Sequence, residues 1–328
     1  MLKKDQKLNP DIFKEDVEQV PIRVGFGDGL LQAGDEDPNV VGLCADLTDS
    51  TKMNKFAMRY PERFVEIGVA EQNLASVGSG MAAMGKIPFV SSYAMFSPGR
   101  NWEQIRTTIC YNDVPVKIAG SHAGISVGPD GGTHQAIEDI AITRVIPNMV
   151  VISPCDSIQA KKATLACAKT KEPTYLRLAR EKTPIITTGD TPFEIGKADV
   201  YFESENPEVT VIATGALLHK AISVAEKIKD EIKVNVVNLH TIKPLDEKTI
   251  LEEVGKSGAV VTVEEHQIAG GMGSAVSELL AKEKPCPVEF VGVKDEFGQS
   301  GKPSELIEHY GMGEGHIEEA IRKVLSRK

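Results

Sequence analysis

Several features that mark particular classes of protein are scarce or missing in this sequence of 328 residues. The five cysteines are an odd number and none forms a Cys-x-x-Cys pair, so we expect neither a disulfide framework nor a zinc site. No apolar run reaches membrane-spanning length, and the first residues are too charged for a signal peptide. We therefore expect a cytoplasmic protein, and the start at Met1 leads us to expect a complete chain.

An excess of basic residues is also lacking. The 37 Lys and Arg residues against 47 Asp and Glu residues give a formal net charge of −10. This balance predicts no nucleic-acid or membrane partner, because both attract basic surfaces. What remains is an ordinary composition, 41% hydrophobic and 26% charged, with enough length for two domains that each bury a core.

Short β-branched runs alternate with segments of helical period along most of the chain. The expected strands are 40–44, 64–68, 87–93, 115–120, 149–153, 173–179, 209–215, 234–240, 259–265 and 288–293, and the clearest helices are 72–84, 156–169, 217–229 and 274–282. The alternation predicts an α/β fold with two doubly wound domains, each a mostly parallel sheet with helices on both faces. We expect an N-terminal extension at 1–15, domains at 16–185 and 209–328, and a linker at 186–208 with room for a hairpin.

The tripeptide Gly27-Asp28-Gly29, with Asn54 after twenty-four intervening residues, has the spacing of a thiamine diphosphate site whose Asp and Asn hold Mg²⁺. Such a site needs a strand that ends at the first motif, a long helix, and a second strand that ends at the Asn. Here a turn-like DEDPN follows soon after Gly29, and strand 40–44 ends ten residues before Asn54. We therefore interpret the tripeptide as a helix start with small residues and predict no metal site on this chain.

Reactive side chains follow the expected strand ends in residues 64–106. Glu71 lies in the first turn of a helix rich in small residues, where an acidic residue commonly complements the helix dipole. Tyr93 and Phe96 come at the end of the next strand, where aromatic residues commonly join the core. The residues alone leave both the structural and the functional interpretation open.

The loop 121–139 carries His122, Asp130 and His134 among several glycines. It follows an expected strand, and doubly wound sheets bind ligands at the carboxyl ends of their strands. Such a loop has little reason to exist for packing, so it predicts a site. Arg177 and Arg180 end the strand 173–179, where one can bind phosphate while the other is solvated.

The runs VEIGVAEQN, FVSSYAMF, GISVGPDGGTHQAIEDIA, PNMVVISPCD and LRLARE resemble the pyrimidine-binding domain of transketolase and its relatives. NLHTIKPLDEKTI and VTVEEHQIAGGMGSAVSE resemble the C-terminal domain of that family. The resemblance runs from about residue 16 to the end and leaves out the family's diphosphate-binding domain. It therefore implies the C-terminal subunit of a split transketolase.

This resemblance assigns roles to individual residues. Glu71 matches the glutamate that contacts N1′ of the thiamine diphosphate pyrimidine during catalysis. The other cofactor residues implied are Phe96 and Tyr93 in the pyrimidine pocket and Asp46 and Leu47 at its edge. Those implied for substrate are His122 and Asp130 at the sugar hydroxyls and Arg23, Ser50, His134 and Arg180 at the phosphate.

The resemblance also implies a shared cofactor: a companion N-terminal transketolase subunit would bind Mg²⁺ and the diphosphate, and these chains would form a homodimer within a hetero-oligomer. The reaction implied moves a two-carbon ketol unit between sugar phosphates, as in the pentose phosphate pathway. Half of a deoxyxylulose-phosphate synthase, a β subunit of a 2-oxoacid dehydrogenase and a non-catalytic scaffold are the alternatives. Gly99 stands where transketolases tend to have Tyr and the synthases Arg, and Arg100 follows it, so the sugar and the role of Arg100 stay open.

Overall fold

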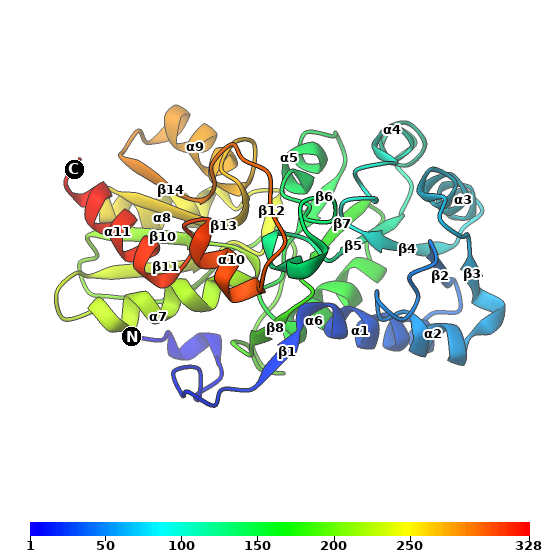
Figure 1. Ribbon diagram of the computed structural model, residues 1–328, viewed down its shortest axis with the longest axis horizontal. Coiled ribbons are helices and arrows are strands. Elements are labelled where there is room, and N and C mark those ends of the chain that lie inside the picture. The colour runs from blue at the N-terminus through cyan, green and yellow to red at the C-terminus, as the bar shows by residue number, and fades with distance from the viewer.

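Two β-sheets with helices packed on both faces organise residues 1–328 in the computed structural model, and the two domains lie side by side (Figure 1). The first sheet has the order β12-β6-β7-β5-β4-β2-β3. Its strands are β2 (Val40–Cys44), β3 (Phe64–Glu66), β4 (Ile87–Tyr93), β5 (Lys117–Ser121), β6 (Val150–Ile152), β7 (Thr174–Leu178) and β12 (Thr241–Lys243). All pair in parallel except β12, which comes from the second half of the chain and pairs antiparallel with β6.

The second sheet has the order β14-β13-β10-β11-β9. Its strands are β9 (Asp199–Phe202), β10 (Val209–Ala213), β11 (Val234–Asn238), β13 (Val260–Gln267) and β14 (Val288–Val293). β9 pairs antiparallel with β11, whereas the other pairs are parallel. The segment 186–208, expected to be a linker, therefore contains an edge strand of the second sheet rather than a hairpin. The α/β class and the two doubly wound domains are as the sequence predicts.

Helices connect the strands of both sheets. In the first half they are α1 (Ile22–Glu36), α2 (Asn54–Arg59), α3 (Glu71–Ala83), α4 (Trp102–Gln104), α5 (Asp139–Arg144) and α6 (Ser157–Ala168). In the second half they are α7 (Leu218–Ile228), α8 (Glu247–Ser257), α9 (Met272–Glu283), α10 (Pro303–His309) and α11 (Glu314–Leu325). α4 continues into a π-helical turn, Ile105–Cys110. None of the helices is long and apolar enough to cross a membrane.

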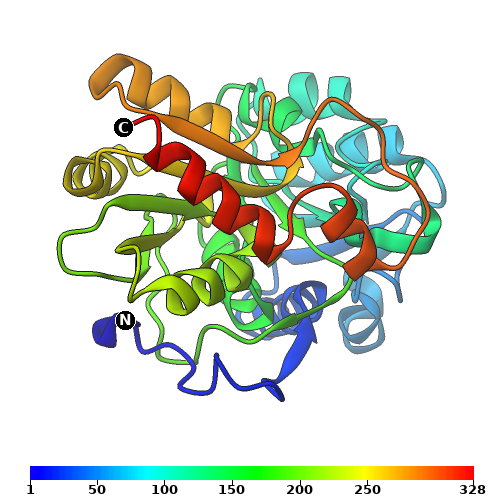
Figure 2. The same cartoon turned by 60° about the vertical axis from the view of Figure 1, so that its left-hand side comes forward.

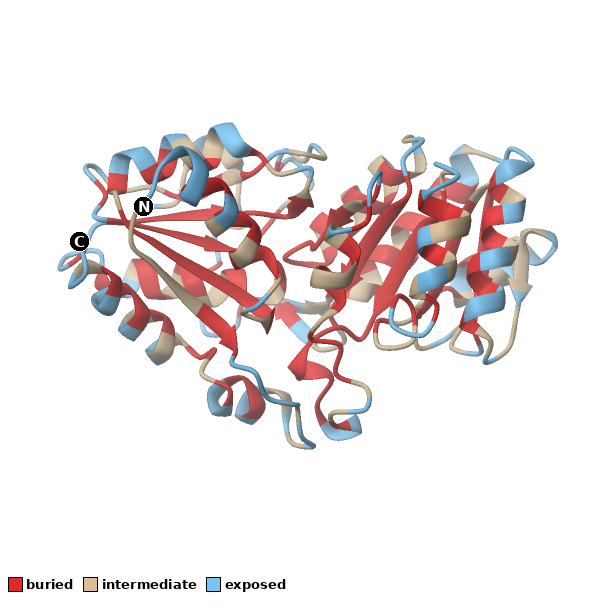
Figure 3. Ribbon diagram, turned by 90° about the horizontal axis from the view of Figure 1, so that it is seen from above, coloured by how far each residue is buried: buried red, intermediate tan, exposed pale blue.

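Local sequence explains where several helices begin and end. The side chains of Asp156 and Asp246 accept hydrogen bonds from backbone N–H groups three residues later and so cap α6 and α8. Gly258 ends α8 with φ of 70°, a left-handed conformation that costs glycine little. Every residue of β2, β5, β7, β10 and β11 is buried, as expected for parallel strands covered on both faces. Figure 3 shows these strands buried between helices whose outer faces are exposed.

The tripeptide at Gly27–Gly29 lies in the middle of α1, so its interpretation as a helix start is wrong. Its surroundings explain the small residues, because α1 packs closely against α6. A Cβ on Gly25 would overlap the carbonyl oxygen of Ser157, and one on Gly29 would lie 2.8 Å from Cβ of Thr164. Asp28 is instead partly exposed and pairs with Lys55 at 2.6 Å. The structure contains no group of three or more His, Cys, Asp or Glu side chains that could hold a metal ion.

The N-terminal segment crosses from one domain to the other (Figure 2). Leu2 bridges to Phe202 of β9, and Ile12 is buried in the core of the second domain, where its carbonyl oxygen lies 2.9 Å from Nε2 of His219. The chain then enters the first domain through β1 (Gln19–Pro21), which pairs antiparallel with β8 (Lys182–Pro184). This pairing has a consequence for the site, because it brings the start of α1 next to the end of β7.

Candidate active site

The residues singled out in the sequence gather at the carboxyl edge of the first sheet. Asp46 follows β2, Glu71 follows β3, Tyr93 ends β4, His122 follows β5, and Arg180 follows β7. Neighbouring parallel strands end at the same edge, which is where doubly wound sheets place their ligands. In the β4–β5 register Tyr93 is opposite Ser121, so the ring of Tyr93 lies next to that of His122.

Glu71 is the first residue of α3, and its carboxylate is buried with 1% of its surface exposed. One carboxylate oxygen accepts a hydrogen bond from the Ser92 hydroxyl at 3.2 Å, and the other accepts one from the Arg100 guanidinium at 2.6 Å. The side chain of Asn101 donates to the Glu71 carbonyl oxygen at 2.9 Å, which ties the two segments together. A residue that served only the helix dipole would have no need of this burial or of these partners.

Four rings form a continuous cluster beside Glu71. Tyr93 stacks on His122 with ring centroids 3.8 Å apart and on Phe96 at 6.1 Å. His134 meets the edge of Phe96 at 5.3 Å. Tyr93, Phe96 and His134 are only partly buried, so these aromatic residues line a surface and do not belong to the core.

Positive charge converges next to this cluster. The guanidinium of Arg23 donates to the carbonyl oxygen of Ser50, and Arg180 donates to that of Val127 at 2.6 Å. Burial, followed by the charge of Arg180, lowers the pKa of Arg23. Nε of Arg23 is buried without a hydrogen-bond partner. Two neighbouring cations and an unpaired donor are what an anion would satisfy.

The same cations act on His122. Burial, followed by the charges of Arg23 and Arg180, lowers the pKa of its imidazole to about 3. His122 is therefore neutral at physiological pH, and its Nδ1 lies 2.8 Å from the Ser121 hydroxyl. Lys52 contributes to the same shift, which places a further cation at the site. No motif in the sequence pointed to Lys52, although its φ of 67° is unusual for a lysine and indicates a constrained loop.

Some of the expected residues stay outside this cluster. Asp130 is exposed, and its side chain makes no hydrogen bond or ion pair. Asp46 and Leu47 lie in the loop after β2, where Glu66 accepts hydrogen bonds from the backbone N–H of Asp46 at 2.7 Å and of Gly68 at 2.9 Å. The sequence analysis did not single out Glu66, although it is an acidic residue at a strand end, two residues before Gly68.

Arg177 is not a solvated partner of Arg180, so that alternative is wrong. It is buried and pairs with Asp139 at 2.8 Å, and it also donates to the carbonyl oxygen of Glu265 at 2.8 Å. Successive residues of a strand point to opposite faces. Arg177 lies within β7 and is buried, whereas Arg180 lies beyond the end of the strand at its carboxyl edge.

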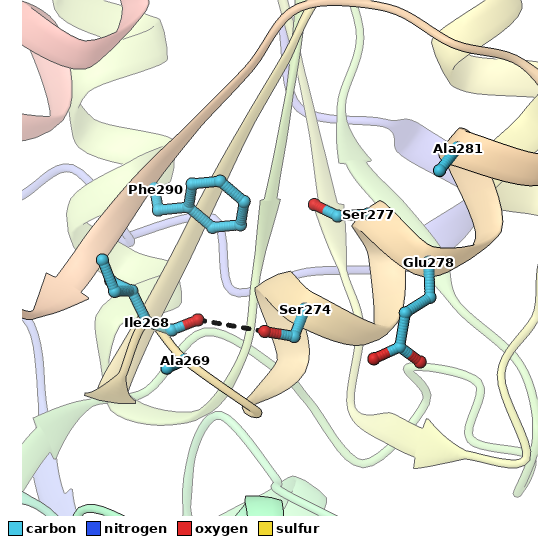
Figure 4. Close-up of a pocket in the computed structure, with 7 residues that line it drawn as sticks. All are labelled: Ile268, Ala269, Ser274, Ser277, Glu278, Ala281 and Phe290. Carbon is cyan, nitrogen blue, oxygen red and sulfur yellow. Dashed lines mark hydrogen bonds between the residues drawn. The ribbon is translucent and has the colours of Figure 1, made fainter.

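Two hollows lie elsewhere on the molecule. A pocket of about 510 Å³ lies between α9 and the end of β13 (Figure 4), and its only titratable side chain, Glu278, is paired with Arg144 at 2.6 Å. A cleft of about 640 Å³ lies between the domains and is lined by Ser126 and Glu181 on one side and His219 and Lys302 on the other. Neither hollow is lined by Glu71, Phe96 or Arg23.

Comparisons with known proteins agree on one family. The model of the transketolase pyrimidine-binding domain matches residues 18–185, and that of the transketolase C-terminal domain matches residues 196–317. A putative transketolase C-terminal section of Methanocaldococcus jannaschii is 42% identical and covers 94% of this chain and 97% of its own length. The 6-deoxy-6-sulfo-D-fructose transketolase subunit SqwH of a Clostridium species is 37% identical over 96% of this chain and 98% of its own length.

A solved structure supports the same conclusion. It is described as a split gene transketolase, an inactive beta4 tetramer, and it matches with a TM-score of 0.87 and 42% identity over 94% of this chain and 99% of its own. Human transketolase is 34% identical, but the match covers only 50% of that longer protein. The chain therefore belongs to the transketolase family, as a counterpart of its pyrimidine-binding and C-terminal domains.

Proposed function

We propose that this chain is the C-terminal subunit of a thiamine diphosphate-dependent transketolase that moves a two-carbon ketol unit between sugar phosphates. The observation that carries the proposal is the buried Glu71 carboxylate, which lies beside a partly exposed aromatic cluster and next to a group of cations. A carboxylate, a ring and an anion site are the three elements that such a reaction needs from this half of the protein.

The residues present fit the pyrimidine end of the cofactor. The ring of Phe96 already carries a planar group, the Arg100 guanidinium, 4.8 Å from its centroid. Glu71 would hold a proton at N1′ of a ring stacked on Phe96, with Tyr93 beside it and with Asp46 and Leu47 at the edge. When bound, thiamine diphosphate supplies the stabilisation of the carbanion, and the protein supplies binding, orientation and the proton at N1′.

The cations fit an anionic sugar. Arg23, Arg180, Lys52 and His134 would bind its terminal phosphate, with Ser50 adjacent. The neutral imidazole of His122 would exchange hydrogen bonds with a donor hydroxyl, and Asp130, on its exposed turn, would reach another hydroxyl. A sulfonate carries a similar set of oxygens, and one relative is named for a sulfonated sugar. Sugars of the pentose phosphate type and a sulfonated ketose are therefore the substrates to compare.

The diphosphate and its Mg²⁺ are assigned to a companion N-terminal subunit. Two observations support this: the glycines of the apparent motif serve close packing, Gly29 against α6 and Gly27 against Lys52, and the match to human transketolase covers half of that protein. We further propose a homodimer of these chains within a hetero-oligomer of the cytoplasm, and domains at 16–185 and 209–328. A deoxyxylulose-phosphate synthase half, a 2-oxoacid dehydrogenase subunit and a scaffold are the alternatives to test.

The replacement Glu71→Gln tests the role of the carboxylate. Gln cannot take up or release a proton, and the loss of a general acid–base group typically lowers turnover by about 10²–10⁴-fold. The variant is to be combined with the companion chain, and ketol transfer is measured. Glu103→Gln, at an exposed position of α4, is the control. Near-normal turnover by the Glu71→Gln complex would reject the proposal. If the wild-type complex transferred an acyl group in place of a ketol unit, that result would favour the dehydrogenase alternative.

A further inference from the structure

Arg100 makes the two contacts that the proposed function assigns to the cofactor pyrimidine. Its guanidinium lies over the ring of Phe96, with Cζ 4.8 Å from the ring centroid, and it donates a hydrogen bond to the Glu71 carboxylate at 2.6 Å. A guanidinium is planar, carries N–H donors at its edge and stacks on aromatic faces, so it imitates a protonated heteroaromatic ring.

Both oxygens of the Glu71 carboxylate already have a partner while Arg100 is bound. One of its oxygens accepts from Arg100 and the other accepts from Ser92. The guanidinium lies over the ring of Phe96, the ring on which a pyrimidine would stack. Arg100 and the cofactor ring would therefore compete for the same carboxylate oxygen and the same aromatic surface.

We propose that Arg100 is a displaceable occupant of the pyrimidine pocket, and that cofactor binding requires the Arg100 side chain to leave Glu71. This inference rests on the proposed function, because it assigns the same pocket to thiamine diphosphate. In the cofactor-free chain Arg100 neutralises a buried carboxylate that would otherwise be costly to leave unpaired. The apparent affinity for the cofactor is then reduced by the fraction of molecules in which the pocket is occupied.

The surrounding backbone is built for a movement of the side chain alone. The neighbouring Asn101 is buried, and its amide donates to the Glu71 carbonyl oxygen at 2.9 Å and to the Ser97 hydroxyl at 3.1 Å. The Arg100 side chain, in contrast, is 48% exposed and has no other ion pair. It can therefore rotate into solvent while the backbone that joins it to Glu71 stays in place.

Gly99 explains why no aromatic residue fills this position. A Cβ on Gly99 would overlap the carbonyl oxygen of Met95, so the backbone of this turn has no room for the Tyr that transketolases tend to carry there. The pocket is closed by the next residue instead. The same turn therefore carries both Gly99, where the family tends to have Tyr, and Arg100, which pairs with Glu71.

The ion pair itself is tested on the chain alone with Arg100→Met, which keeps the length of the aliphatic side chain. Arg100→Met should lower the urea midpoint of unfolding, because it leaves the Glu71 carboxylate unpaired. The same replacement in a Glu71→Gln background should lower it much less, because no buried charge remains. Equal shifts in both backgrounds would show that the pair is not formed in solution and would overturn the inference.

The competition is tested by titrating the same full-length variants with thiamine diphosphate and with its pyrimidine half, 4-amino-2,5-dimethylpyrimidine. Binding is followed by calorimetry and by the fluorescence of Trp102, which is the only tryptophan and lies two residues from Arg100. Arg100→Met should bind both ligands about tenfold more tightly than the wild type, as expected if about nine molecules in ten hold the closed pair. Arg106→Met, which removes an exposed arginine of the π-helical turn after α4, should leave the affinity unchanged.

A Phe96→Ala variant separates the two proposals. If Phe96→Ala weakens binding but Arg100→Met binds no more tightly than the wild type, the occupant role fails and the cofactor pocket stands. If neither replacement alters binding, or if no variant binds either ligand even when the companion chain is present, then the pocket is not a pyrimidine site. In that case both the occupant role and the proposed function fail.

Discussion

At the scale of single residues, the proposed recognition of an anionic sugar depends on two arginines. Arg23 lies in the first turn of α1 and Arg180 follows β7, and the pairing of β1 with β8 brings the two residues close together. Each guanidinium uses a backbone carbonyl as one partner and keeps further donors for a ligand. Neighbouring guanidinium groups repel each other, and an anion bound between them relieves that repulsion.

We expect Arg180→Ala to raise KM for a phosphorylated donor more than it lowers kcat. A charge-assisted hydrogen bond contributes about 1.5–3 kcal/mol, which corresponds to a loss of about 10- to 150-fold in kcat/KM. Most of this anchoring acts on ground state and transition state alike, so it appears in KM. The measurement compares xylulose 5-phosphate with hydroxypyruvate in the assembled enzyme, for Arg180→Ala and for His134→Ala.

The donor without a phosphate is the internal control of that experiment, since it has no phosphate for Arg180 to bind. Arg59→Ala, which removes an exposed arginine of α2, is the control for charge. Equal losses on both donors would show that Arg180 and His134 do not bind the phosphate. A sulfonated ketose measured beside the phosphate would show which anion the site prefers.

His122 gives a prediction about pH. Its pKa is about 3 in the folded chain, and an unfolded histidine titrates near 6.5. The unfolded state therefore binds the proton more readily, so the contribution of His122 to stability is present above pH 6.5 and is lost as the pH falls toward 3. Between pH 6.5 and pH 5 this loss amounts to about 1–2 kcal/mol.

We expect His122→Asn to remove that part of the pH dependence, because Asn does not titrate and tolerates the positive φ of 57° at this position. Urea unfolding at pH 7.5, 6.5, 5.5 and 5.0 measures the free energy of unfolding of each variant. His309→Asn, at an exposed position of α10, should unfold with the wild-type pH dependence. If His122→Asn also keeps that dependence, the imidazole is not held neutral by its surroundings.

Sequence reasoning at this scale located the residues that follow strand ends. Glu71, Tyr93, Phe96, His122 and Arg180 gather at one edge because parallel strands end together there, which the alternation of elements already implied. Contacts that depend on side-chain direction were not accessible in the same way. The ion pair of Arg100 and the burial of Arg177 follow from tertiary packing, and no spacing in the sequence encodes them.

At the scale of elements, the packing of α1 on α6 depends on glycines. We expect Gly25→Ala to lower the stability of the chain by about 1–3 kcal/mol, because its Cβ would overlap the backbone of Ser157 and force the helices apart. Gly80→Ala is the matched control, since Gly80 is an exposed residue inside α3 with nothing within 4 Å of its Cβ position. That replacement should raise stability by about 0.4–1 kcal/mol.

Urea midpoints of the two variants check this pair. A tolerated Gly25→Ala would mean that α1 and α6 are not packed closely, and the Gly27–Gly29 tripeptide would again need an explanation. The Gly27–Gly29 tripeptide also shows how far a sequence motif can predict secondary-structure elements. The composition around Gly27 correctly argued against a strand-to-helix turn. It did not show that these residues lie inside a helix, because close packing between two helices has no distinct sequence pattern.

Short edge strands were among the elements missed from the sequence. β9 was assigned to a linker, and β12 was hidden within the residues after β11. Both are short, antiparallel and at the edge of a sheet, so neither shows the long buried apolar run of a central parallel strand. The central strands and the four clearest helices were predicted to within a few residues for the opposite reason.

At the scale of the whole molecule, the two domains are joined by more than one connection. β12 of the second half extends the first sheet, and the N-terminal segment buries Ile12 in the second domain before it enters the first. Arg177 of the first domain donates to the Glu265 carbonyl oxygen of the second. These contacts let the second domain support the loop that carries His134, where Gln135 donates to the carbonyl oxygen of Gln299 at 3.0 Å.

At this scale, the proposed function assigns only one end of the cofactor site to this chain. Glu71 and Phe96 can hold a pyrimidine, but no group of acidic or histidine side chains is placed to hold Mg²⁺ against a diphosphate. Hard cations such as Mg²⁺ are held by carboxylates together with the phosphates themselves. Without them, the diphosphate adds little to the binding energy of the pyrimidine. We therefore expect the purified chain to bind thiamine diphosphate weakly, with no dependence on Mg²⁺, and to show no ketol transfer.

Calorimetry with and without Mg²⁺ measures this binding, and an assay with xylulose 5-phosphate measures the transfer. Addition of the companion chain should restore both tight, Mg²⁺-dependent binding and turnover, because the diphosphate then gains its metal and its anchoring residues. Submicromolar, Mg²⁺-dependent binding by the purified chain would contradict this expectation. It would place a complete cofactor site on this polypeptide, and the division of the active site between two subunits would have to be abandoned.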